Sequence, residues 1–161
     1  MIALGTDKIP DVRLAFSVLT NNDTTILDMP SLFTRIIRGE IPGHFVHRDE
    51  ICVAFLTINP IATGHTLVVP IAEIDQWTDL PIATTNHVMQ IATNIGNAHK
   101  KLYACKRVGL IIAGFEIPHC HLHVIPTNTM SDLSFDRAAA HVDASQLADQ
   151  AAKIAEVLKT I

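Results

Sequence analysis

The chain has 161 residues, of which 48% are hydrophobic and 17% are charged. This composition excludes an intrinsically disordered protein, which combines low hydrophobicity with high charge. The formal net charge is −4 and no basic face stands out, so we expect no binding to a nucleic acid duplex. No apolar run approaches the roughly 18–20 residues of a membrane helix. The first residues lack the basic start, apolar stretch and small-residue cleavage site that are typical of a signal peptide. We therefore expect a soluble, cytoplasmic protein that does not enter a membrane.

The three cysteines, Cys52, Cys105 and Cys120, are widely spaced and odd in number. This usage fits neither a disulfide framework nor a CxxC zinc site. The cysteines therefore give no reason to expect a bound metal, and we expect no cofactor.

Residues 1–28 differ in character from the rest, because they hold one short apolar run followed by a polar tract. We expect them to form an N-terminal extension, with a disordered tail and an extra strand as the two alternatives. A further hypothesis is that Met29 is the natural start. A compact domain is predicted over residues 29–130, and a loop followed by a helix over 131–161.

The first predicted elements are a short helix and three strands. Residues 32–37 have a helical pattern, with Ser31 as the N-terminal cap and Gly39 where a C-terminal cap falls. Strands are predicted over 45–47, 51–58 and 66–69. The segments between them are too short for helices, which indicates an antiparallel meander.

The second half of the chain alternates helix and strand. An apolar stripe predicts a long helix over residues 82–104, and two strands follow over 108–112 and 118–125. A second stripe predicts a helix from residue 143 to the end. The fold class is therefore α+β, with a five-stranded antiparallel sheet, one long helix and a C-terminal helix.

Three histidines alternate in the last predicted strand. Because side chains in a strand point to opposite faces in turn, His119, His121 and His123 are expected to share one face. A chance arrangement is disfavoured, since three buried imidazoles need six satisfied nitrogens and an exposed face has no need of imidazole.

Two kinds of chemistry use such a row of imidazoles. One is metal binding, since imidazole is a good zinc ligand. The other is phosphoryl or nucleotidyl transfer, in which the central imidazole attacks phosphorus and its neighbours donate hydrogen bonds to the phosphate oxygens. The second is favoured, because His65 enters a strand that can neighbour the row and no cysteine or acidic residue stands at a ligand spacing.

Three motifs, in this order, resemble the histidine triad (HIT) superfamily, which includes the fragile histidine triad and Hint-type proteins. They are the opening FTRIIRGEIP over residues 33–42, the strand GHTLVVP over 64–70 and the triad itself. The resemblance runs from residue 32 to 126. It implies a nucleotide-binding α+β fold that pairs as a homodimer through the long helix and the strand over 108–112. It also implies hydrolysis or transfer at the α-phosphate of a purine nucleoside phosphate or phosphoramidate, through a covalent nucleotidyl-histidine.

The resemblance assigns a role to each histidine. His121 matches the nucleophile, with one ring nitrogen facing phosphorus and the other donating to a backbone carbonyl. His119 and His123 match the flanking histidines that contact the phosphates, and His65 matches the fourth histidine of the site.

The nucleoside pocket is assigned less specifically. Ile58 and Asn59 match the loop that carries this pocket, and Phe33, Ile36 and Ile37 match residues that line the base. Apolar residues at these positions also fit a plain core.

The chain departs from the family pattern at several positions. Thr57 stands where many members have an acidic residue or Asn that holds the ribose hydroxyls, and Phe115 replaces a glutamine that meets the phosphate. Glu116 stands where Hint-type proteins have Ser; it is either a general acid for the leaving group or a surface carboxylate. Residues 32–34 lack the zinc-binding cysteines of some members.

Three functions therefore remain in competition. The first is a nucleotide hydrolase or nucleotidylyl transferase, and the second is a module that binds purine nucleotides with little turnover. The third, ranked last, is a metalloprotein built on the triad and His65.

Overall fold

The computed structural model describes residues 29–161, so the expectations for residues 1–28 lie outside the described part. The elements in chain order are α1 (Leu32–Ile37), β1 (His44–Arg48), β2 (Cys52–Leu56), β3 (Thr66–Pro70), the 3₁₀ turn η3 (Trp77–Asp79), α2 (Ile82–Leu102), β4 (Arg107–Ile111), β5 (Leu122–Thr127), the 3₁₀ turns η4 (Met130–Leu133) and η5 (Phe135–Arg137), and α3 (Ala144–Leu158). In these residues no helix is long and apolar enough to cross a membrane.

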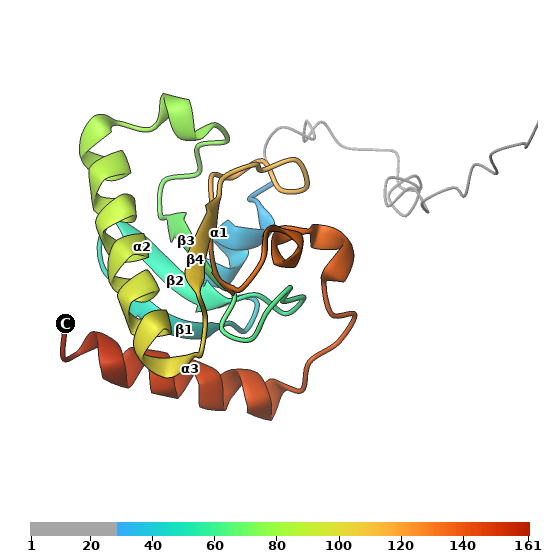
Figure 1. Ribbon diagram of the computed structural model, residues 1–161. Coiled ribbons are helices and arrows are strands. Elements are labelled where there is room, and N and C mark those ends of the chain that lie inside the picture. The colour runs from blue at the N-terminus through green and yellow to red at the C-terminus, as the bar shows by residue number, and fades with distance from the viewer. Residues whose placement is uncertain (1–28) are drawn as a thin grey trace, which may run out of the picture.

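The five strands form one antiparallel sheet in the order β1-β2-β3-β5-β4. Helices α2 and α3 lie together on one side of this sheet, and α1 lies on the other (Figure 1). The predicted α+β class, with a five-stranded antiparallel sheet, a long helix and a C-terminal helix, is confirmed.

Side chains alternate between two cores on either side of the sheet. From β2, Cys52, Ala54 and Leu56 enter the core beneath α2 and α3. Val53 and Phe55, between them, enter a smaller core beneath α1. All five residues of β2 are buried, as a central strand covered on both faces requires.

Helix α1 is fixed at both ends by its predicted caps. The Ser31 hydroxyl accepts a hydrogen bond from the Thr34 amide at 3.1 Å, which satisfies one free N–H of the first turn. Gly39 has φ +77°, a conformation that favours glycine, and its amide donates to the Ile36 carbonyl. The helix is therefore closed after six residues.

Two strand predictions were wrong at their ends. Strand β2 stops at Leu56 and not at Ile58, because the Asn59 amide turns back to the Thr57 hydroxyl. Strand β5 begins at Leu122 and not at Pro118, because the Cys120 amide donates to the Ile74 carbonyl in the loop after β3. His119 and His121 therefore precede the strand.

The two long helices are each shorter at the C-terminal end than predicted. Helix α2 ends at Leu102, since Tyr103 has an extended backbone with φ −120° and ψ 139°. Helix α3 ends at Leu158, with Lys159 as its C-terminal cap.

Candidate active site

A cavity of about 540 Å³ opens on the α1 side of the sheet. A volume of this size suits a small-molecule ligand. His65, His121 and His123 line it together with Phe33, whose ring meets the His121 ring edge-on at 4.8 Å. The structure thus brings three of the four predicted histidines to one cavity.

His121 is held with one nitrogen committed and the other free. Its Nδ1 lies 2.7 Å from the His119 carbonyl oxygen, which only accepts, so Nδ1 carries the proton. The unprotonated Nε2 then has a lone pair, and no hydrogen-bond partner for it lies within residues 29–161. This is the tautomer that a nucleophilic imidazole needs.

His65 sets the tautomer of His123 through a chain of hydrogen bonds. The Ile61 amide donates to Nδ1 of His65 at 3.2 Å, so the proton of a neutral His65 is on Nε2. That proton is donated to Nδ1 of His123 at 2.9 Å. His123 therefore carries its own proton on Nε2 and can donate it to a ligand oxygen.

His119 lies elsewhere than the strand pattern predicted. Its Nε2 donates to the Pro70 carbonyl at 2.8 Å, and its Nδ1 lies 2.7 Å from the Ser31 hydroxyl. The side chain is fully buried and does not line the cavity. Because both ring nitrogens are engaged, His119 contributes through its backbone carbonyl on His121 and not as a phosphate donor.

A small polar network fixes His119 from behind. The Glu73 carboxylate accepts from the Ser31 amide, at 3.1 Å to each oxygen, and from the Thr34 hydroxyl. Burial raises the pKa of Glu73, but these hydrogen bonds outweigh it and the pKa is lowered overall. The network links α1, the loop after β3 and the triad.

Burial keeps the cavity histidines neutral at pH 7. Burial, together with a smaller effect of the neighbouring imidazoles, lowers the pKa of His65 to about 4 and that of His123 to about 3. Burial also lowers the pKa of His121, while the His119 carbonyl and the Glu116 carboxylate act in the opposite direction. The lone pair on Nε2 of His121 is therefore available at neutral pH.

The predicted nucleoside pocket is largely brought together. The cavity lining includes Phe33, Ile36, Thr57, Ile58, Asn59 and Glu116 but not Ile37 or Phe115. The Phe115 side chain is 98% exposed, so it does not replace a phosphate contact. The Thr57 hydroxyl accepts from the Asn59 amide, and the Asn59 side chain donates to the Ala139 carbonyl.

Sequence reasoning missed four residues around this site. Ser31 was assigned only as a helix cap, and no role was given to Thr34, Glu73 or Phe135. The Phe135 ring meets the His123 ring at 5.0 Å, so the segment after the sheet also shapes the cavity. Two hydroxyls three residues apart at a helix start were the one usable signal, since Glu73 and Phe135 arrive only through the fold.

A metal at the triad does not fit this arrangement. Two triad nitrogens bond to backbone carbonyls, and His65 and His123 bond to each other. The hypothesis of a metalloprotein built on the triad and His65 is left with two ring nitrogens that are unengaged among the described residues, Nε2 of His121 and Nε2 of His123, one fewer than the three protein ligands of a catalytic zinc site.

The comparison with known proteins agrees with the geometry. A family model described as the HIT domain matches residues 38–130. The chain belongs to the HIT family. Members similar to it include two curated enzymes and many solved structures.

Three of these relatives are informative. Adenosine 5'-monophosphoramidase HNT1 of Saccharomyces cerevisiae is 34% identical over 101 residues, which are 62% of this chain and 64% of the yeast protein. Adenylylsulfatase HINT3 of Arabidopsis thaliana is 28% identical over 109 residues, 65% of this chain and 55% of the plant protein. A Hit-like protein from Bartonella henselae superposes with a TM-score of 0.70 at 27% identity, covering 79% of this chain and 95% of that one.

Proposed function

We propose that this HIT protein is a nucleotide hydrolase or nucleotidylyl transferase acting at the α-phosphate of a purine nucleoside phosphate or phosphoramidate. One observation carries the proposal: Nδ1 of His121 is bonded to a backbone carbonyl, so Nε2 faces the cavity as a neutral nucleophile. Two relatives whose names specify cleavage next to an adenylyl group support it.

The first step is an exchange of bonds at phosphorus. The lone pair on Nε2 of His121 forms the N–P bond while the bond to the leaving atom breaks, and Nε2–H of His123 donates to a phosphate oxygen. Glu116 lines the cavity near His121 and, in its protonated form, is the proposed proton donor to the leaving atom. The His119 carbonyl stabilises the positive charge that develops on the His121 ring.

Water completes the reaction. Water attacks phosphorus on the nucleotidyl-histidine and gives a proton to the Glu116 carboxylate, while the N–P bond breaks and its electron pair returns to Nε2 of His121. The nucleoside monophosphate is then released. Little covalent assistance is needed at phosphorus, so positioning and charge stabilisation dominate the rate.

The purine ring is proposed to lie against apolar side chains of the cavity. The apolar lining includes Phe33, Ile36, Phe55 and Leu67. Thr57, a neutral group, is the proposed ribose contact, which gives a weaker hydrogen bond than a carboxylate would.

A nucleotide-binding module with little turnover is the second candidate. It is favoured by the neutral Thr57, whose hydroxyl already accepts from the Asn59 amide, and by Phe115, which points into solvent. Such a module would bind AMP as tightly as an enzyme does and release almost none from a substrate.

Turnover of adenosine 5'-phosphoramidate separates the two. We expect the wild-type chain to release AMP and His121→Asn to lose this activity by roughly 10³-fold or more, the scale of nucleophile deletion. AMP affinity, measured by calorimetry, should change far less. Wild-type AMP binding without release would favour the module, and near-normal turnover by His121→Asn would overturn the assignment of the nucleophile.

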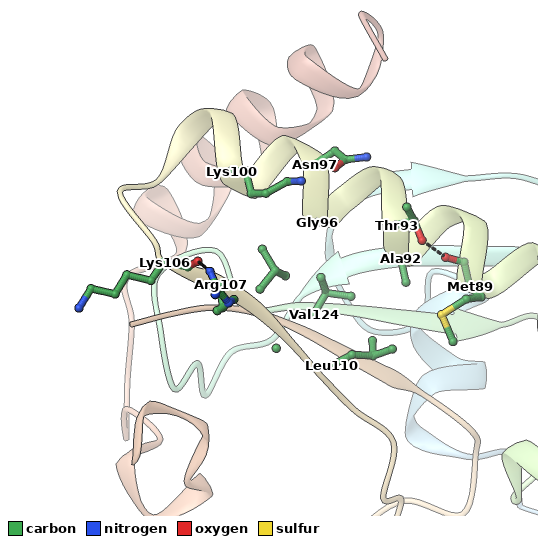
Figure 2. A pocket seen from close by; sticks show the side chains of 12 residues that line it. Met89, Ala92, Thr93, Gly96, Asn97, Lys100, Lys106, Arg107, Leu110 and Val124 are labelled. Atoms are coloured by element: carbon green, nitrogen blue, oxygen red, sulfur yellow. Dashed lines mark hydrogen bonds between the residues drawn. The ribbon is translucent and has the colours of Figure 1, made fainter. Parts of the chain in front are cut away.

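We also propose that two copies pair through α2 and β4. Strand β4 is an edge of the sheet, and Leu110 on it is 44% exposed. A hollow of about 380 Å³ lies between this strand and α2. Met89, Ala92 and Leu110 are among the side chains that line it (Figure 2). An apolar edge of this kind invites pairing with another strand.

A further inference from the structure

A second cluster of histidines lies outside the cavity, at the β1–β2 hairpin and α2. Nε2 of His47 and Nε2 of His87 each lie 2.7 Å from the same oxygen, Oδ2 of Asp49. The Cys52 thiol completes the group, and the four ligand atoms all lie within 4.8 Å of one another. Neither the triad nor the cavity lining includes any of these residues.

A bulge in β1 places His47 in the cluster. The register between β1 and β2 shifts between Phe45 and His47, so that His47 pairs with Ala54. Ala54 faces the core beneath α2, and His47 therefore points to the side from which His87 comes. Without the bulge, His47 would pair with Val53, which faces the other core. Bulges that redirect a side chain in this way are over-represented at functional sites.

The carboxylate of Asp49 is oriented independently of the histidines. Its Oδ1 accepts from the Ile51 and Cys52 amides, both at 2.8 Å, which leaves Oδ2 for the imidazoles. Burial raises the pKa of Asp49, but these amides and the two histidines lower it well below its usual range. The Asp49 oxygen and the two imidazoles are therefore already held close together, as the ligands of a metal site are by their hydrogen-bond partners.

We propose that His47, Asp49, Cys52 and His87 form a Zn²⁺ site. Two imidazole nitrogens, one carboxylate oxygen and one thiolate are ligands that zinc takes in four-coordinate tetrahedral sites. Bonds of about 2.0–2.3 Å imply ligand separations of roughly 3.3–3.7 Å, so small side-chain movements from the present positions are enough. The hydrogen-bonded cluster is then the metal-free form of the site.

Zinc can reach the site from solvent. The side chains of His47, His87 and Asp49 are 28%, 31% and 29% exposed, while Cys52 is fully buried behind them. On binding, each imidazole proton moves from Nε2 to Nδ1 and the thiol releases its proton. Burial and the Asp49 charge raise the pKa of Cys52 to about 12 in the metal-free form, so the ion must supply the energy of that deprotonation.

A bound ion would join the first hairpin to the long helix. Three of its ligands lie on or beside β1 and β2, and the fourth lies on α2. Since zinc would bind the folded chain and not a preformed site in the unfolded one, it should raise the melting temperature. This role is structural and does not depend on the proposed catalysis.

Cobalt titration of the purified full chain tests the proposal. We expect one Co²⁺ per chain, with the thiolate-to-cobalt absorption that only a cysteine ligand gives, and displacement of Co²⁺ by Zn²⁺. The band should disappear in Cys52→Ser and remain in Cys120→Ser, a matched control in which another buried thiol of the same core is changed.

His87→Gln provides a variant that does not disturb the core. Loss of this partly exposed imidazole should weaken Co²⁺ and Zn²⁺ binding at least 10-fold. It should also abolish the rise in melting temperature with Zn²⁺. His123→Gln, in the cavity, should leave both unchanged. The proposal is overturned if the cobalt band is absent, if it survives in Cys52→Ser and His87→Gln, or if it is lost in His123→Gln, which would assign the metal to the triad.

Discussion

Each histidine of the cavity has one nitrogen whose role is set by a backbone group or by another imidazole. The His119 carbonyl fixes His121, and the Ile61 amide fixes His65 and through it His123. The result is one lone pair on His121 next to one N–H on His123, a nucleophile beside a donor. Burial lowers the pKa of His65 and of His123 and so keeps these rings uncharged at neutral pH.

The pH dependence of turnover follows from this burial. The nucleophile must be unprotonated, and a lowered pKa keeps His121 neutral down to a pH at which a free imidazole is half charged. We therefore expect the acidic limb of kcat/KM to be centred below pH 6.5, because kcat/KM falls only as the pH drops through the lowered pKa of His121.

Glu116→Gln supplies the matched variant for the pH profile. Its carboxylate acts to raise the pKa of His121, so removing the charge should move the acidic limb to still lower pH. A limb centred at or above pH 6.5 in the wild type would contradict the proposed protonation state of His121.

At the scale of single elements, the cap of helix α1 contributes both to the stability of the fold and to the position of His119. Ser31 caps the helix through Thr34 and also donates to Nδ1 of His119. Ser31→Ala removes both contacts and leaves a buried acceptor unpaired, so we expect a loss of roughly 1–3 kcal/mol in the free energy of unfolding. Urea denaturation measures this loss.

Asp143→Ala is the control for the cap. Asp143 stands at the same position before α3, but its side chain makes no capping hydrogen bond. Its replacement should cost less than about 0.5 kcal/mol. Equal losses in the two variants would show that neither the capping bond nor the bond to His119 adds to the stability of the folded chain.

The sequence predicted those features of the fold that local residue patterns determine, namely helix caps and amphipathic helices. The caps Ser31 and Gly39 were visible as residue types, and the apolar stripes located α2 and α3 to within a few residues. The resemblance of the triad to a known family supplied the proposed nucleophile, His121. Its strict alternation did not supply the geometry, because the Cys120 amide bonds to Ile74 and holds the first two histidines outside β5.

The remaining features depend on contacts between distant segments. Glu73 meets Ser31 across 42 residues, and the bulge that turns His47 toward His87 leaves no mark in the local pattern. A pattern with period two predicts which residues share a face only while the strand is regular. The network around His119 and the cluster of His47, Asp49 and His87 both lie where a strand stops being regular.

At the scale of the whole molecule, the two faces of the sheet are divided between two tasks. The cavity lies on the α1 side. Helices α2 and α3 cover the other side (Figure 1), and β4 is an edge strand of the sheet. An open edge next to a hollow is the proposed place for a two-fold axis, because the same surface then serves both copies.

The homodimer can be tested at that edge. Sedimentation at micromolar concentration should give roughly twice the chain mass of 17.6 kDa for the wild type. Leu110→Lys places a charge on the edge strand and should give a monomer, because an edge lysine opposes strand pairing. Ile51→Lys is the control: Ile51 is 41% exposed against 44% for Leu110, but it lies in the turn at the opposite edge of the sheet. A wild-type monomer would contradict the proposed dimer. A dimer that Leu110→Lys leaves intact would show that the pairing surface lies elsewhere.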